Sequence, residues 1–219
     1  MSVIAVIGTG NIGGTIGRAV ARSGAGTGAG TGARSGAGAG LEVVFGSRDP
    51  GGSTAAGDTA AKVVTHAEAV AAADVVLLAQ PADQVADFLR THAAALDGKL
   101  VLDATNRFPG PVLNSAAEVA ELVPGARYAR AFNSQAWETF ETPTWDGGVQ
   151  GDLFYTTSTA DDRAAVEAII EAVGLRPQYA GENRPDLLDA LLFLAVPAYA
   201  THGRHTGLRL LTDTPDGTA

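Results

Sequence analysis

Three glycines near the N-terminus have the spacing that holds a dinucleotide. Residues 3–18 read VIAVIGTGNIGGTIGR, which is a short apolar run, then Gly8-x-Gly10-x-x-Gly13, then a helix-like pattern. Gly8 permits a tight turn, Gly10 has no side chain to keep the backbone from a pyrophosphate, and Gly13 lets the following helix pack closely. The N–H groups and positive dipole end of that helix then face the phosphates. In this strand–helix context the motif predicts dinucleotide binding, and the alternative is an ordinary glycine-rich turn.

The residues after the second expected strand bear on the choice between NAD and NADP. Ser47 and Arg48 stand where an NAD-preferring site carries an acidic residue for the ribose 2′-hydroxyl. A guanidinium can hold a 2′-phosphate with a planar fork of donors, and the hydroxyls of Ser47 and Thr9 add further donors. The sequence therefore predicts NADP(H) as cofactor. The alternative is that Arg48 only caps a loop.

A stretch rich in glycine and alanine, residues 24–40, separates the first expected helix from the second strand. The sequence ARSGAG occurs twice, at 21–26 and at 33–38, which favours a slippage insertion over a lid or partner-binding loop. Such a composition is typical of a flexible linker or surface loop. Without the 16 residues 25–40, Arg48 follows Gly8 by 24 positions, near the spacing expected of a dinucleotide site.

Composition excludes several classes of function. The chain has 219 residues, a formal net charge of −9 and no cysteine. The negative charge argues against a nucleic-acid partner, and the absence of cysteine excludes disulfides and thiolate ligands. The four histidines have no metal-binding spacing, so we expect no metal. With no signal-peptide pattern and no apolar run of transmembrane length, we expect a cytoplasmic protein with no membrane partner.

Alternating strand and helix patterns predict a parallel sheet covered on both faces. We expect strands at 3–7, 41–46, 63–65, 74–79, 99–103, 127–132, 153–157 and 175–180. We expect helices at 11–22, 55–62, 67–73, 82–95, 160–173 and 184–211, the last kinked or split by Pro197. The fold class is therefore α/β, a Rossmann-type doubly wound parallel sheet with a small C-terminal α/β extension.

The chain divides into two expected domains. Residues 1–132 form an NADP-binding Rossmann domain that contains the 24–40 insert. Residues 133–219 form a C-terminal lobe that completes the substrate cleft. The last expected helix is apolar over a wide arc between Leu187 and Leu194, which suits either core packing or a contact between subunits.

Polar segments at the carboxyl ends of the later strands form the expected substrate side of the cleft. Ligands of an open α/β sheet bind at that edge. Two segments are expected to contact the ribose and nicotinamide: Ala79-Gln80-Pro81 and Ala104-Thr105-Asn106. A third offers polar groups beside an aromatic plane that suits a planar heterocycle: Asn133, Ser134, Gln135 and Trp137. The alternatives are ordinary loop polarity and, for Trp137, a core anchor.

The sequence assigns no catalytic residue. Hydride transfer between two cofactors needs positioning more than an acid or base. The chain has no Ser/Tyr/Lys set with the spacing of short-chain dehydrogenases. Reduction of a carbonyl or imine would also need a proton donor, for which His202, Tyr155 and Tyr199 are candidates.

The same segments resemble a known family, the NADPH-dependent deazaflavin reductases, also called coenzyme F420-dependent NADP oxidoreductases. The resemblance is carried by IAVIGTGNIGGTIGRAVARSG and LEVVFGSRDP, and further by DVVLLAQPADQV, KLVLDATNRF and AFNSQAWETFETP. The segment from 152 to 183 resembles the C-terminal lobe of the family. The match is close over the first 48 residues without the insert and looser on the substrate side.

The resemblance implies a Rossmann core, NADP(H), hydride exchange with coenzyme F420 as co-substrate, and a homodimer. By matching positions it implies 2′-phosphate contacts at Thr9, Ser47 and Arg48. It also implies a pyrophosphate loop at Gly8, Gly10, Asn11, Ile12 and Gly13. Two other functions stay open: NADPH-dependent reduction of a small imine or ketone, and a non-catalytic NADP(H)-binding sensor.

Overall fold

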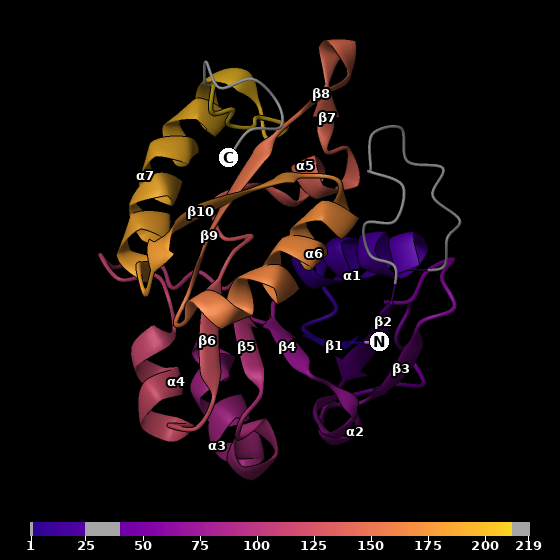
Figure 1. Cartoon of the computed structure of the whole chain (residues 1–219). Helices are drawn as coiled ribbons and strands as arrows, with labels where there is room; N and C mark the ends of the chain where they lie inside the picture. Colours follow the sequence, from indigo (N-terminus) through magenta and orange to yellow (C-terminus); the bar gives the residue numbers. More distant parts are fainter. Residues whose placement is uncertain (1, 25–39, 212–219) are drawn as a thin grey trace.

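The computed structural model describes residues 2–24 and 40–211 (Figure 1). Residues 25–39, which make up most of the expected insert, lie outside the described residues. The chain folds around one eight-stranded sheet, in the order β10-β9-β6-β5-β4-β1-β2-β3. Its strands are β1 (Ser2–Ile7), β2 (Leu41–Ser47), β3 (Lys62–Thr65), β4 (Val75–Leu78), β5 (Leu100–Asp103), β6 (Arg127–Arg130), β9 (Asp152–Thr157) and β10 (Arg176–Glu182).

The six strands from β3 to β6 are parallel and follow the order of a Rossmann fold. The strand order reverses between β1 and β4, so their carboxyl ends form the edge where such folds bind ligands. The predicted Rossmann-type sheet is confirmed. Beyond β6, strand β9 pairs antiparallel and β10 pairs parallel with β9, so the C-terminal part extends the same sheet.

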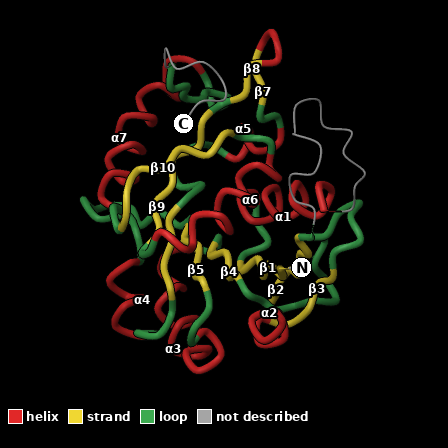
Figure 2. Tube along the Cα trace, viewed as in Figure 1, coloured by secondary structure: helices red, strands yellow, loops and turns green. Residues whose placement is uncertain are grey.

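Helices cover both faces of the sheet (Figure 2). They are α1 (Asn11–Gly24), α2 (His66–Ala72), α3 (Val85–Leu96), α4 (Ala116–Leu122), α5 (Trp137–Glu141), α6 (Arg163–Val173) and α7 (Pro185–His202). One core contains buried residues of α1, α5 and α6, and the other contains buried residues of α2, α3 and α4. Ile4 and Val6 belong to the first core and Ala5 and Ile7 to the second, as alternation along a strand requires.

The expected helix at 55–62 is wrong. Residues 54–59 form consecutive turns, in which Gly57 donates to the carbonyl oxygen of Thr54 and Thr59 donates to that of Ala56. Gly57 has a φ of +56°, a left-handed conformation that ends a helix. Arg18 donates to the carbonyl oxygen of Ala55, which anchors these turns to α1.

The C-terminal part differs from expectation in two ways. Helix α7 runs unbroken through Pro197 and ends at His202, because Gly203 has a φ of +88°. The expected continuation to residue 211 is therefore wrong. The structure also contains elements that the sequence patterns did not indicate: α4, α5 and the small hairpin of β7 (Thr144–Trp145) and β8 (Val149–Gln150). The other expected elements are present, with ends that differ by a few residues.

Candidate active site

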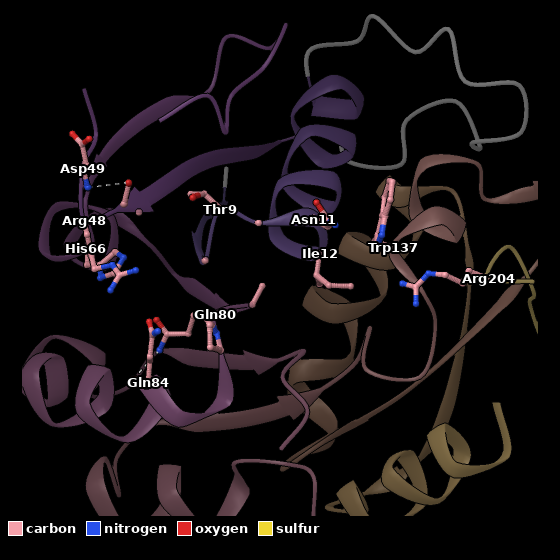
Figure 3. A pocket seen from close by; sticks show the side chains of 16 residues that line it. Thr9, Asn11, Ile12, Arg48, Asp49, His66, Gln80, Gln84, Trp137 and Arg204 are labelled. Atoms are coloured by element: carbon pink, nitrogen blue, oxygen red, sulfur yellow. Dashed lines mark hydrogen bonds between the residues drawn. The ribbon is translucent and has the colours of Figure 1, made fainter. Parts of the chain in front are cut away.

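A cavity of about 690 Å³ opens at the carboxyl ends of β1, β2 and β4 (Figure 3). Its floor is the loop between β1 and α1. Its lining is Gly8, Thr9, Gly10, Asn11, Ile12, Gly46, Ser47, Arg48, Asp49, His66, Ala79, Gln80, Pro81, Gln84, Trp137 and Arg204. Ten of the fourteen residues expected to bind the cofactor are in this set, so the structure brings most of that prediction to one place.

The glycine loop has the geometry that a pyrophosphate needs. Gly8 has a φ of +105°, and a Cβ there would lie 2.4 Å from the carbonyl carbon of Ala79. A Cβ at Gly13 would lie 2.0 Å from the carbonyl oxygen of Gly8, so α1 packs directly against the turn. A Cβ at Gly10 would meet nothing within 4 Å, because this residue faces the open cavity. The loop therefore fits a dinucleotide, with the space above Gly10 left for phosphates.

The end of the cavity next to β2 is cationic. Arg48 is exposed and has no ion pair or hydrogen bond with any residue in 2–24 or 40–211. The neighbouring Asp49 points away from Arg48 in Figure 3 and accepts a hydrogen bond from the Gly52 amide at 3.2 Å. Ser47 also lines this end, and its hydroxyl oxygen accepts from the Asp49 amide at 3.1 Å. A free guanidinium beside a hydroxyl is suited to bind a phosphate.

His66, at the start of α2, lines the same end of the cavity as Arg48 (Figure 3). Burial lowers the pKa of His66, and the nearby His92 and Arg48 lower it further. Sequence reasoning missed His66 as a site residue. Its position directly after β3 was the available signal, because β3 ends at the same edge of the sheet as β1 and β2.

The opposite end of the cavity is formed by Trp137 of α5 and Arg204, which follows α7 (Figure 3). Arg204 pairs with Glu138 at 2.5 Å, which fixes the segment after α7 against α5. This hydrogen bond raises the pKa of Arg204. Between the two ends, Gln80 lies at the end of β4 and donates to the carbonyl oxygen of Gln84 at 3.1 Å. Arg204 and Gln84 were also missed, and no spacing in the sequence connects Arg204 to the glycine loop.

Thr105, Asn106 and Asn133 do not line the cavity, and neither does Ala104. Thr105 donates to Asp103 at 2.6 Å, and Asn106 donates to the carbonyl oxygen of Asn133 at 2.8 Å. The amide of Asn133 donates in turn to the carbonyl oxygen of Leu188 in α7 at 2.9 Å. These polar groups are thus occupied in holding loops to each other and to α7.

Ser134 and Gln135 line a different, mainly apolar cavity of about 260 Å³ beside α7. The side-chain amide of Gln135 donates to the carbonyl oxygen of Asp152 at 2.7 Å. Of the four residues expected on the substrate side, Trp137 is therefore the one that lines the dinucleotide-sized cavity.

The three candidate proton donors also lie outside the larger cavity. The Tyr155 hydroxyl donates to Glu167, and burial raises the pKa of Tyr155. The Tyr199 hydroxyl donates to the carbonyl oxygen of Ser134, and burial raises the pKa of Tyr199 to about 12. His202 is exposed in the last turn of α7.

A buried charged network joins β5 and β6 to α7. Arg130 of β6 pairs with Asp103 of β5 at 3.1 Å and with Asp189 of α7 at 2.7 Å. Tyr128 donates to Asp103 at 2.8 Å, and Asn106 accepts from Arg130 at 3.0 Å. This network fixes α7 to the carboxyl ends of the central strands.

The sequence model of a family described as "NADP oxidoreductase coenzyme F420-dependent" matches residues 3–107. Residues 3–107, which are 105 of the 219, are thus similar to this family. The matched residues supply the lining of the cavity from Gly8 to Gln84. This match supports NADP-dependent oxidoreductase activity and NADP(H) binding.

Solved structures share the fold over most of the chain. A protein from Arthrobacter sp. FB24, provisionally described as an F420-dependent NADP reductase, has a TM-score of 0.74 at 19% identity, covering 97% of this chain and 100% of that one. A hypothetical protein from Sinorhizobium meliloti has a TM-score of 0.65 at 26% identity, covering 83% and 86%. An imine reductase from Bacillus cereus has a TM-score of 0.64 at 18% identity, covering 92% of this chain and 62% of its own.

A search of curated proteins found no match to the chain. Among residues 2–24 and 40–211, no helix combines the length and the apolar character needed to cross a bilayer. The same part of the chain contains no group of three or more potential metal-binding side chains of His, Cys, Asp or Glu.

Proposed function

We propose that this NADP-dependent oxidoreductase transfers a hydride between NADP(H) and the deazaflavin coenzyme F420. The observation that carries the proposal is that one cavity contains the glycine loop, with Arg48 at one end and Trp137 at the other. The family description names the same pair of coenzymes and supports the assignment.

Each part of the cavity has a separate binding role in this proposal. The backbone above Gly10 and the N-terminal amides of α1 receive the pyrophosphate. Arg48, with the hydroxyls of Ser47 and Thr9, receives the 2′-phosphate. Bound NADP(H) supplies or accepts the hydride. Trp137 presents an aromatic surface to a planar heterocycle at the opposite end.

The ionisable side chains of the cavity favour transfer between two coenzymes. They are Arg48, Asp49, His66 and Arg204. The first three lie at the β2 end in Figure 3, and Arg204 is a cation held by Glu138. A hydride step that needs positioning alone is consistent with such a lining. Reduction of an imine or ketone is the second candidate. It is less well supported, because Tyr155, Tyr199 and His202 lie elsewhere.

We extend the proposal to a homodimer formed through α7. This helix exposes Phe193, Leu194 and Val196 to 47%, 66% and 46%, which is a large apolar surface for a free helix. Light scattering after size exclusion tests the assembly. If the measured mass at micromolar concentration is that of one chain, the homodimer is contradicted. We expect Leu194→Glu to shift the dimer toward the monomer.

One experiment tests the hydride acceptor. Purified protein is mixed with NADPH and oxidised F420, and the absorbance of the oxidised deazaflavin is followed. We expect bleaching that depends on NADPH and is slower in Arg48→Ala. Bound NADPH without bleaching contradicts the proposal. Oxidation of NADPH by a panel of imines and ketones would then favour the second candidate, and no turnover with any acceptor would favour an NADP(H)-binding sensor.

A further inference from the structure

We propose that His66 is a second ligand of the NADP(H) 2′-phosphate, acting together with Arg48 to select NADP(H) over NAD(H). The inference rests on the proposed placement of the 2′-phosphate at Arg48. It adds His66, which begins α2 directly after β3, to a 2′-phosphate site that the sequence assigned to Thr9, Ser47 and Arg48.

The position of His66 is fixed by packing on two sides. A Cβ at Gly46 would lie 3.2 Å from Cδ2 of His66, so the imidazole packs on the backbone of β2 one residue before Ser47. The ring centroid of Phe88 lies 5.7 Å away at an interplanar angle of 80°, and that of His92 lies 6.3 Å away at 76°. The ring is therefore held at the cationic end of the cavity.

The imidazole has free hydrogen-bonding capacity. Within residues 2–24 and 40–211, neither ring nitrogen of His66 has a hydrogen-bond partner. The residue is half-buried and lines the cavity beside Arg48 (Figure 3). A donor that is held in place, faces a cavity and has no partner of its own is suited to bind a ligand oxygen.

The charges around His66 predict that its protonation is coupled to binding. Arg48, which follows β2, and His92 of α3 are its charged neighbours; Asp49 lines the same end of the cavity but points away, and Glu68 lies on its own helix. Two of these groups are already engaged: Glu68 accepts from the Thr65 amide at 2.9 Å, and Asp49 accepts from Gly52. Burial, His92 and Arg48 keep the His66 pKa below its ordinary value, which favours the neutral form of the free ring.

A bound 2′-phosphate reverses this balance. A phosphate monoester carries about −1.5 to −2 charges at neutral pH, and a negative charge beside an imidazole raises its pKa. Binding of NADPH should therefore take up a proton from solvent onto His66. NADPH affinity should rise as the pH falls from about 8 toward about 6, where the phosphate itself begins to protonate. NADH has no 2′-phosphate and should show neither effect.

Calorimetric titration with NADPH and with NADH tests the inference. The wild type, His66→Gln and His92→Gln are compared at pH values of about 6, 7 and 8, in buffers of different ionisation enthalpy. We expect His66→Gln to weaken NADPH binding about tenfold at the lowest pH, because a charge-assisted hydrogen bond is lost. Proton uptake should fall in this variant. Its NADH affinity should change less than about twofold, which also verifies that the variant folds.

Two further variants separate charge from shape. His92→Gln keeps a polar side chain at this position but removes a neighbour that lowers the His66 pKa, so NADPH affinity should stay equal or increase. His66→Arg should restore NADPH affinity at alkaline pH without proton uptake, because its charge is fixed.

Equal weakening of NADPH and NADH by His66→Gln overturns the inference, as does unchanged NADPH affinity. A wild type that does not prefer NADPH overturns the 2′-phosphate site at Arg48 together with it. If Arg48→Ala loses the preference for NADPH over NADH but His66→Gln keeps it, the role of His66 alone is overturned. Failure of deazaflavin reduction leaves the binding result intact, because the titration contains no hydride acceptor.

Discussion

Arg130 and Asp189 join β6 to α7 through an ion pair of 2.7 Å, and their side chains are 0% and 5% exposed. Arg130 also pairs with the fully buried Asp103, so one guanidinium serves two buried carboxylates. We expect Arg130→Met to lower the free energy of unfolding by about 3–5 kcal/mol, because it leaves both carboxylates without their cation. Denaturant unfolding measures the loss.

The matched control for Arg130 is Arg90→Met. Arg90 pairs with Asp87 at 2.8 Å on the surface, where the two side chains are 60% and 87% exposed. We expect a change below about 0.5 kcal/mol, since exposed pairs contribute little. Similar losses in the two variants would mean that the buried network does not support α7.

The second prediction compares two glycines of the same loop. Gly10→Ala adds a methyl group to open space, so we expect unchanged thermal stability but NADPH affinity weakened at least tenfold by contact with the pyrophosphate. Gly13→Ala places its methyl 2.0 Å from the carbonyl oxygen of Gly8, so we expect a clear loss of stability. Melting curves and NADPH titrations measure both. Normal NADPH affinity in Gly10→Ala would place the pyrophosphate elsewhere.

The third prediction concerns the choice of cofactor. Arg48→Ala should weaken NADPH binding by about ten- to a hundredfold, because a hydrogen-bonded charge pair with the 2′-phosphate is lost. NADH affinity should change little. Arg22→Ala is a control at another exposed arginine, which pairs with Asp58 outside the cavity. Equal weakening of NADPH and NADH by Arg48→Ala would exclude the 2′-phosphate role.

The fourth prediction concerns the cap that begins α2. Thr65 accepts from the Glu68 amide, and Glu68 accepts from the Thr65 amide and hydroxyl. Thr65→Ala should cost about 1 kcal/mol of stability at pH 7. These hydrogen bonds lower the pKa of Glu68, so its contribution is present above the ordinary value of 4.5 and lost as the pH falls. The difference between Thr65→Ala and wild type should therefore shrink in acid; a constant difference would contradict the reciprocal cap.

The fifth prediction separates the two ends of the cavity. Trp137→Leu should raise the KM for oxidised F420 several-fold and leave the Kd for NADPH nearly unchanged, because the aromatic surface lies away from Arg48. The control is Trp145→Phe. Trp145 stacks on His205, with 4.8 Å between the ring centroids, and does not line this cavity. Steady-state kinetics with F420 as the varied substrate measures the KM. An equal KM for F420 in the two variants would contradict the role of Trp137.

Most of the residues expected to bind the cofactor line one cavity, because their positions depend on local geometry. A turn that needs a positive φ at Gly8 and close packing at Gly13 restricts the residue type directly. Strand order then brings Ser47 and Arg48 to the same edge, since parallel strands end together. The fold class followed from the same alternation of strands and helices.

The features that the sequence did not predict depend on contacts between segments that are distant in sequence. Asn133 is polar and follows a strand, but its amide donates to Leu188, which lies 55 residues away in sequence. Arg204 reaches the cavity because α7 ends at Gly203 and Glu138 holds its guanidinium. Residues 55–62 are rich in alanine, yet the conformation of Gly57 and the hydrogen bond from Arg18 favour turns over a helix. Such effects leave no period or spacing in the sequence.

The two ends of the cavity come from separate parts of the chain. The floor and the Arg48 end lie within residues 3–107, and Trp137 and Arg204 lie outside that match. In the proposed function, the residues that we assign to NADP(H) and Trp137, which we assign to the acceptor, therefore belong to separate stretches of the chain. We therefore expect a chimaera joined after residue 107 to keep the coenzyme preference of the parent that supplies residues 3–107.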